Sequence, residues 1–123
     1  MSAIHKFKNR DGGFCWDGVE IQHYSTEQAA KVTKQVLIGA RDGAGNFEMR
    51  YFELVPQSRT SLDQHEHDHG VMVVRGRGKV RINEQQSEIE YGDVVYISAN
   101  DLHQFANDSE EPFGFICIIP PKS

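Results

Sequence analysis

The chain contains 123 residues, of which 38% are hydrophobic and 25% are charged, and its formal net charge is −5. These values are typical of one folded domain, because the chain can build a single core but is too short for two domains of ordinary size. The 13 lysines and arginines are scattered along the sequence instead of forming a basic patch, which argues against nucleic acid as a partner.

The N-terminal segment MSAIHKFKNRDGG lacks the apolar core of a secretory signal. No apolar run in the sequence is long enough to cross a bilayer. We therefore expect a cytoplasmic protein with no membrane partner. Residues 1–17 are polar, and we predict a loose N-terminal lead-in that Phe14 and Trp16 anchor on the body of the domain.

Short apolar or alternating segments, separated by turn residues, follow one another along the rest of the chain. Residues 25–31 could hold one helical turn, but no helix is long enough to cross over between parallel strands. About ten short strands therefore predict an all-β sandwich or barrel. The predicted strands cover residues 19–24, 32–38, 47–55, 65–75, 79–83, 87–91, 94–97, 103–107 and 113–119.

Half of the six histidines lie in one pentapeptide, HEHDH at residues 65–69. In an extended strand, side chains two apart share a face, so three imidazoles would point one way and two carboxylates the other. Converging imidazoles suit a transition metal such as Zn, Cu, Fe or Ni, so the pattern predicts a metal site. A turn at Gly76 and Gly78 is expected to join this strand to residues 79–83 as a hairpin.

The remaining histidines and the two cysteines show no pattern that indicates a functional site. His5 and His23 stand alone and are predicted to be surface residues. Cys15 and Cys117 have no partners at metal-ligand spacing, which favours two reduced, largely buried thiols over a disulfide. The nearly continuous apolar run at residues 113–119 must be covered on both faces, either as a central strand or by a second subunit.

The second half of the chain contains two groups of residues at fixed spacing. They are His65, His67 and Gly76 in the first group, and Gly92, His103 and Asn107 in the second. The two groups resemble the motifs of the cupin superfamily, of which the first combines His-x-His with a glutamate and a glycine, and the second leads from a glycine to a histidine and an asparagine. The resemblance covers roughly residues 47–119. It implies an antiparallel jelly-roll barrel, or double-stranded β-helix, in which residues 1–123 form a single domain.

Two departures from the family pattern carry information. Asn100 stands where the second motif has a turn glycine, and asparagine tolerates the left-handed conformation such a turn needs. The metal-binding glutamate is missing, and counting back from Gly76 places His69 at the position of that glutamate. The segment between His67 and Gly76 is two residues shorter than the family pattern. A two-residue deletion leaves His69 on the same face of the strand as His65 and His67, so we expect His69 to replace the glutamate. If the register follows Gly78 instead, the position falls on Val71, and His69 lies in a loop or lines the pocket.

The resemblance therefore implies a divalent transition metal, such as Zn, Ni, Fe, Cu or Mn, in the mouth of the barrel. The implied ligands are His65, His67, His69 and His103. Glu66 and Asp68 are expected to be solvated charges on the opposite face of the strand. Family resemblance also favours a homodimer.

Two classes of function remain open. The first is a metal-dependent enzyme that acts on a small organic substrate, with the dioxygenase, isomerase, lyase and cyclase types unresolved. In that case Tyr51 or Glu53 could serve as a general base if their face of the strand points inward. The second is a non-catalytic module that binds or senses a small ligand or a metal, which four ligands saturating the metal would favour.

Overall fold

The structure is a computed structural model that describes residues 2–10, 12–24 and 31–121. Strands make up nearly all of its regular structure, together with one short 3-10 helix. In chain order the elements are β1 (Phe7–Arg10), β2 (Gly13–Trp16), β3 (Ile21–Tyr24), β4 (Val32–Ile38), η1 (Ala40–Asp42), β5 (Glu48–Leu54), β6 (His69–Arg75), β7 (Arg77–Ile82), β8 (Gln85–Glu90), β9 (Val94–Ile97), β10 (His103–Ala106) and β11 (Phe113–Ile119).

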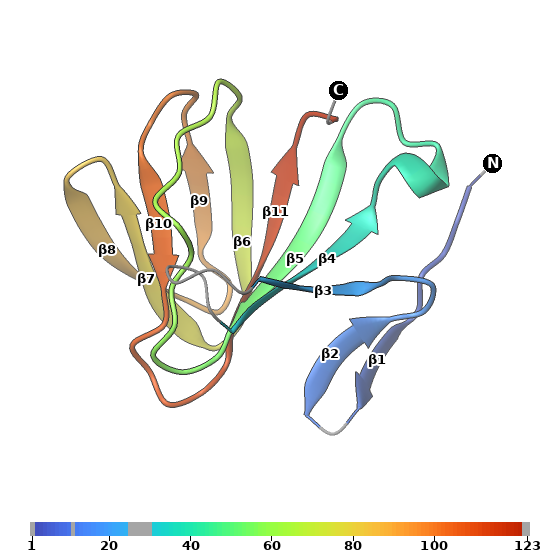
Figure 1. Cartoon of the computed structure of the whole chain (residues 1–123), viewed down its shortest axis with the longest axis horizontal. Coiled ribbons are helices and arrows are strands. Elements are labelled where there is room, and N and C mark those ends of the chain that lie inside the picture. The colour runs from blue at the N-terminus through green and yellow to red at the C-terminus, as the bar shows by residue number, and fades with distance from the viewer. Residues whose placement is uncertain (1, 11, 25–30, 122–123) are drawn as a thin grey trace.

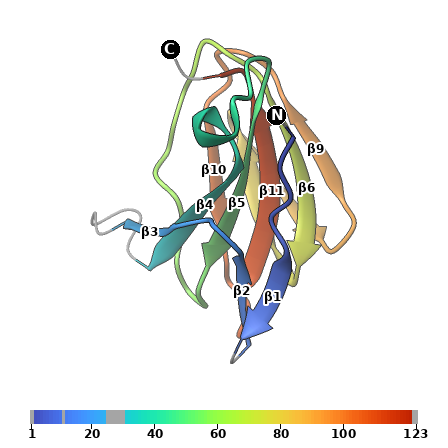
Figure 2. The ribbon, with the colours of Figure 1, turned by 90° about the vertical axis from the view of Figure 1, so that its right-hand side faces the viewer.

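Two antiparallel sheets enclose the interior of the domain (Figure 1). The larger sheet has six strands in the order β3-β4-β5-β11-β6-β9, and the smaller has three in the order β10-β7-β8. A separate hairpin of β1 and β2 lies outside them (Figure 2). The predicted all-β jelly-roll architecture is confirmed. Within the described residues, no helix has the length and apolar character needed to cross a membrane.

The core fills the space between the two sheets. β11 pairs with β5 on one side and with β6 on the other, so the apolar run at residues 113–119 is a central strand, one of the two arrangements expected from its composition. Burying each large apolar side chain contributes about 1.5–3 kcal/mol relative to leaving it in water. The largest buried apolar side chains include Leu54, Val73, Ile97, Phe113 and Phe115.

Most predicted strands agree with the structure, and three of them, at residues 32–38, 94–97 and 113–119, have the bounds of β4, β9 and β11. The turns between strands use the expected residues. Gly92 and Asn100 have φ angles of 92° and 70°, in the left-handed region that glycine and asparagine tolerate best. The helical turn proposed for residues 25–31 falls almost wholly on residues 25–30, which lie outside the described residues.

Two predictions about the histidine segment were wrong. Residues 65–68 form irregular chain, and β6 begins only at His69. In addition, β6 and β7 are not hairpin partners, because β6 pairs with β11 and β9 while β7 pairs with β10 and β8. The turn at Gly76, whose φ is 67°, carries the chain from one sheet to the other. The backbone carbonyl of Pro112 approaches this glycine so closely that a Cβ could not fit.

The hairpin β1–β2 covers the outer face of the larger sheet. The rings of Phe14 and Trp16 lie with their centroids 5.7 and 5.2 Å from that of Tyr51, which is fully buried. The Arg75 guanidinium lies 4.4 Å from the centroid of the Phe14 ring. Phe14 and Trp16 are thus the anchors that the sequence suggested. The segment itself is an ordered hairpin instead of a loose lead-in.

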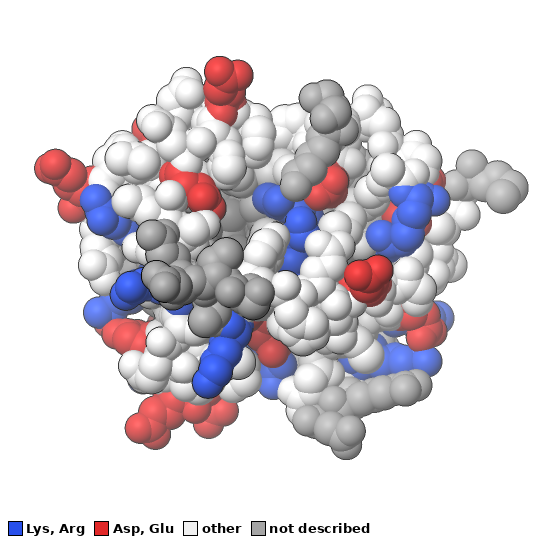
Figure 3. Space-filling model, viewed as in Figure 1, with Lys and Arg blue, Asp and Glu red and all other residues white. Residues whose placement is uncertain are grey.

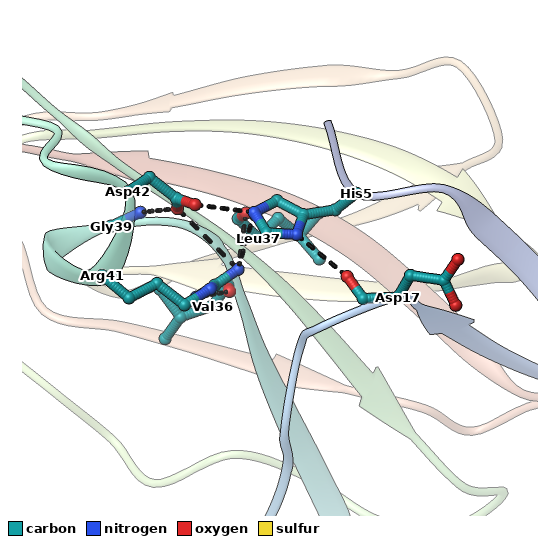
Figure 4. Close-up of polar contacts among 7 residues, drawn as sticks. All are labelled: His5, Asp17, Val36, Leu37, Gly39, Arg41 and Asp42. Atoms are coloured by element: carbon teal, nitrogen blue, oxygen red, sulfur yellow. Dashed lines mark hydrogen bonds and ion pairs between the residues drawn. The ribbon is translucent and has the colours of Figure 1, made fainter. Parts of the chain in front are cut away.

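His5 ties the start of the chain to the turn after β4 (Figure 4). Its Nδ1 lies 2.9 Å from the carbonyl oxygen of Asp17, and its Nε2 lies 2.7 Å from Oδ1 of Asp42. Both of these partners are acceptors, and a donor, Nη2 of Arg41, lies 3.4 Å from the same Nε2. The hydrogen bond from His5 lowers the pKa of the Asp42 carboxyl. His5 is therefore half-buried and links two segments, so the prediction that it is a surface residue was wrong. His23 is exposed, as predicted.

The surface carries charges of both signs. Figure 3 shows Lys and Arg side chains interspersed with Asp and Glu side chains over one face. Lys8 and Asp17 form an ion pair of 2.6 Å, and Lys79 and Asp108 form one of 3.0 Å. Such solvent-exposed pairs contribute no more than about 1 kcal/mol each, so the stability of the fold rests on the core.

Candidate metal centre

Two histidines of the HEHDH segment and one from about 35 residues downstream meet between the two sheets. Each of His65, His69 and His103 offers a ring nitrogen, and these atoms all lie within 4.8 Å of one another. His69 is the first residue of β6 in the larger sheet, and His103 is the first residue of β10 in the smaller sheet. Both strands start at the upper end of the barrel in Figure 1. The cluster therefore joins the two sheets at one end of the interior.

The loop before β6 holds His65 in place through backbone hydrogen bonds. Asp63 and His103 exchange two N–H···O bonds of 2.9 Å each, as a short continuation of the smaller sheet. The amide of Asn100 donates to the carbonyl of His65 at 2.6 Å. The loop is thus held against the start of β10 at Asp63 and against the turn before β10 at His65.

The ring of His103 is oriented by a hydrogen bond typical of metal-ligating histidines. Its Nδ1 lies 3.0 Å from the carbonyl oxygen of Asp101, and a carbonyl can only accept, so Nδ1 carries the proton. In the neutral form of the ring, the other nitrogen, Nε2, carries a lone pair that can bind a metal. Metal-binding histidines commonly use one nitrogen for the metal and the other for such an outer hydrogen bond.

His69 is buried and has an unsatisfied nitrogen. Its Nδ1 is one of three buried side-chain atoms with no hydrogen-bond partner among the described residues. A buried polar atom without a partner costs about 1–3 kcal/mol, so a ligand at this position would relieve a real penalty. Burial lowers the pKa of His69 to about 3, with further lowering from the neighbouring His103. The ring is therefore neutral near pH 7, the form that binds metals.

His65 is the most exposed of the three, and burial lowers its pKa as well. Three imidazoles with converging nitrogens fit a divalent transition metal in both donor type and number. No carboxylate belongs to this group of described residues. The arrangement therefore differs from the two-histidine, one-carboxylate site of many iron oxygenases.

His67 lies beside the cluster but is not one of its three members. Its ring stacks on that of His65, with the centroids 5.1 Å apart and the planes 3° from parallel, and its centroid lies 4.8 Å from that of His69. Its Nδ1 faces the carbonyl of Asp68 at 3.3 Å. The structure thus brings together three of the four predicted ligands. The fourth is displaced because residues 65–68 leave the extended conformation on which the alternation argument depended.

Glu66 and Asp68 are exposed, as expected. Asp68 accepts a hydrogen bond of 2.8 Å from the hydroxyl of Tyr96 on β9. Neither residue belongs to the histidine cluster. A different carboxylate, Asp63, lines the cavity next to the histidines and accepts a hydrogen bond from Ser61 at 3.0 Å.

The three histidines line a cavity of about 240 Å³. Its apolar wall is formed by the rings of Phe52, Phe105 and Phe115, two of which stack with their centroids 4.2 Å apart. Polar groups lie at a few points of this wall. They belong to Arg50, Thr60, Ser61, Asp63 and Cys117.

Strand β5 shows which of its faces points inward, a question that alternation left open. Arg50 and Phe52 line the cavity, so Tyr51 and Glu53 must lie on the opposite face. There the Tyr51 hydroxyl donates to Glu53 at 2.7 Å, and Arg75 donates to the same carboxylate at 2.8 Å. Neither Tyr51 nor Glu53 can therefore act as a base at the histidines. The alternation of β5 had left the direction of Arg50 open as well, and Cys117 was not expected among the cavity residues.

Cys117 stands opposite Arg50 in the pairing of β11 with β5. Both cysteines are free thiols, Cys117 buried and Cys15 half-buried, as predicted. Burial raises the pKa of the Cys117 thiol, and the nearby Arg50 guanidinium opposes that rise. Only the register between the two strands places this thiol in the cavity, so no local pattern in the sequence could have found it.

The comparisons with known proteins agree with this geometry. A family profile described as "Cupin domain" matches residues 50–119. The chain belongs to the cupin family. The matched segment contains all three clustered histidines and both strands that start with one.

Several known proteins are similar to this chain over most of its length. The 1-methylthio-D-xylulose 5-phosphate methylsulfurylase of Rhodospirillum rubrum is 34% identical over 116 residues, which are 92% of this chain and 73% of that protein. A crystal structure of a cupin-2 domain protein from the same organism matches with a TM-score of 0.83 and 33% identity, covering 94% of this chain and 78% of that one. A cupin 2 conserved barrel protein from Rhodopseudomonas palustris matches with a TM-score of 0.82 and 29% identity, covering 98% and 81%.

Proposed function

We propose that this cupin is a metal-dependent enzyme, formed by a single domain, that acts on a small organic substrate. The observation that carries the proposal is the cluster of His65, His69 and His103 in the wall of a cavity of about 240 Å³. Three protein ligands leave coordination positions for a substrate, as in catalytic sites, whereas structural sites are saturated by the protein.

A divalent transition metal such as Zn, Ni, Fe, Cu or Mn at this cluster would supply Lewis-acid chemistry toward an oxygen of the substrate. The protein's own groups would do the rest. Phe52, Phe105 and Phe115 would exclude water and strengthen every electrostatic interaction in the cavity. Asp63 lies among the cavity residues and is the carboxylate best placed to hold or accept a proton.

Two observations support a substrate class: the size of the cavity and the name of the Rhodospirillum rubrum relative. A cavity of about 240 Å³ accepts a metabolite-sized molecule. The Rhodospirillum rubrum relative is named for a ketose phosphate that carries a methylthio group. We therefore propose a small oxygen-rich compound with a carbonyl or hydroxyl group as the substrate.

One observation supports a second candidate, a non-catalytic module that binds a metal or small ligand. The ring centroid of His67 lies only 4.8 Å from that of His69. A small adjustment of residues 65–68 would turn His67 into a fourth ligand, and four ligands would close the metal to substrates.

Metal analysis of untagged protein tests the proposal. We expect one equivalent of a transition metal per chain, bound either as purified or after incubation with divalent ions. The cobalt-substituted protein should then change its visible spectrum when small anions are added, since a position on the metal is open. Absence of stoichiometric metal would disprove the metal-dependent function. A spectrum that no anion or sugar phosphate perturbs would favour the closed, non-catalytic module.

We also propose that the protein forms a homodimer through the outer face of β6, β9 and β11. β9 is an edge strand, and its Val94 and Tyr96 side chains are 74% and 64% exposed, next to Met72 at 47%. A second copy would cover this apolar face and the unpaired edge. Light scattering should give twice the mass of one chain, and Val94→Asp should shift the protein toward the monomer. A native protein that is monomeric at working concentration would remove this proposal.

A further inference from the structure

We propose that Arg50, assisted by Lys34, forms an anion-binding subsite in the cavity, which holds a phosphate or carboxylate group of the substrate. This inference rests on the proposed function, because it assigns a charged group to the substrate of the same cavity. The subsite is distinct from the histidine cluster, since Arg50 and Lys34 lie on β5 and β4 and neither strand carries one of the three histidines.

The Arg50 side chain is buried and has few partners. The residue is 9% exposed and lines the cavity. Its Nη2 donates to the sulfur of Cys117 at 3.2 Å, and its guanidinium lies 5.0 Å from the centroid of the Phe52 ring. Its Nε is buried without a hydrogen-bond partner among the described residues. The closest carboxylate oxygen to Nε is Oε1 of Glu48 at 3.9 Å, which is beyond hydrogen-bond distance.

The contacts of the buried Arg50 guanidinium do not fully offset the cost of burying its charge. Burying a charge is costly unless it is paired and hydrogen-bonded. A thiol is a weak acceptor, and an aromatic face adds only a modest attraction. The planar fork of arginine matches carboxylate and phosphate groups, which accept two parallel hydrogen bonds. An anion in the cavity would supply the acceptors that the protein itself does not.

Lys34 adds a second positive charge on the strand next to Arg50, although it is not itself one of the residues that line the cavity. It lies on β4 opposite Phe52 of β5, so its side chain points to the inner face, and it is 9% exposed. Its Nζ lies 5.9 Å from the ring of Tyr24, which also lines the cavity. Burial, followed by the charge of Arg50, lowers the pKa of Lys34.

The charges on this wall do not balance. Arg50 and Lys34 face one carboxylate, Glu48, which neighbours both of them. The carboxylate that lines the cavity, Asp63, pairs with His103 and accepts a hydrogen bond from Ser61. One net positive charge is thus left on the β4–β5 wall. A substrate with an anionic end would place that end at Arg50 and its reacting oxygen toward the histidines.

Calorimetric titration of metal-free protein with inorganic phosphate and, separately, with acetate tests the subsite. We expect the native protein to bind at least one of the two, and Arg50→Gln to weaken that binding about tenfold or more, the loss expected for charge-assisted hydrogen bonds. Arg50→Lys keeps the charge without the fork and should give an intermediate affinity. Arg81→Gln is the matched control, because Arg81 lies on β7, outside the cavity residues, and should bind as the native protein does.

The outcomes separate the two proposals. Preference for phosphate over acetate assigns a phosphoryl group to the substrate, and the reverse assigns a carboxylate. Unchanged affinity in Arg50→Gln, or native protein that binds neither anion, overturns the subsite. If Arg50→Gln does not fold, affinity of Arg50→Lys equal to the native value overturns it. Native protein and Arg50→Lys should bind the same amount of metal. If neither binds metal, that result counts against the metal-dependent function. The anion titrations still decide the subsite, because they use metal-free protein.

Discussion

Replacement of His69 by alanine is expected to abolish stoichiometric metal binding. The His69 ring is buried between His65 and His103, and its Nδ1 has no partner among the described residues. Removing an outer hydrogen bond to a ligand already costs about 10–100-fold in metal affinity, so removing a ligand should cost more. Calorimetric titration with zinc or manganese, together with elemental analysis, measures the effect.

His67→Ala is the matched control for this prediction. His67 lies in the same segment but outside the group of three, so its loss should change metal affinity much less than the loss of His69. Equal losses in the two variants would make His67 a fourth ligand and favour the closed, non-catalytic site. Full metal binding by His69→Ala would show that the metal centre is wrongly placed.

Gly114→Ala is expected to lower the stability of the fold substantially. Gly114 lies in β11 opposite Glu53 of β5, and a Cβ at this position would overlap the Tyr51 hydroxyl, which a hydrogen bond to Glu53 fixes in place. Overpacking of a filled interior costs about 1–3 kcal/mol. That is a large part of the 5–15 kcal/mol typical for a domain. Urea denaturation followed by circular dichroism measures the change in the free energy of unfolding.

Gly45→Ala serves as the control for Gly114→Ala. No heavy atom lies within 4 Å of the position that its Cβ would take, and the residue has no positive φ. Its effect on the free energy of unfolding should stay within about 1 kcal/mol. Equal stabilities for the two variants would mean that the Tyr51 ring and the N-terminal hairpin above it can move aside at little cost.

The sequence by itself determined most of the strands from β3 onward, their turns and the motif that leads to His103. Strand periodicity is local, because successive side chains point to opposite faces wherever the chain is extended. Turn chemistry is local too, since Gly92 and Asn100 adopt the left-handed backbone that their residue types permit. These local rules explain why the bounds of β4, β9 and β11 followed from sequence.

The membership of the histidine cluster was decided by tertiary structure. Alternation treats residues 65–69 as one strand, but β6 begins at His69 and the preceding loop pairs instead with β10 through Asp63. That pairing brings His65 to the cluster and leaves His67 beside it. A contact across two sheets depends on which segments lie together in space, and no spacing along the chain encodes it.

Tertiary packing also decided which face of strand β5 points into the barrel. Alternation along β5 separates Arg50 and Phe52 from Tyr51 and Glu53, but it cannot say which pair looks into the barrel. The N-terminal hairpin decides, because its aromatic rings cover Tyr51 on the outer face. The same packing leaves the charge of Arg50 in the cavity. Local periodicity thus gives the two faces of a strand, and only the partner surface determines which one becomes the wall of a site.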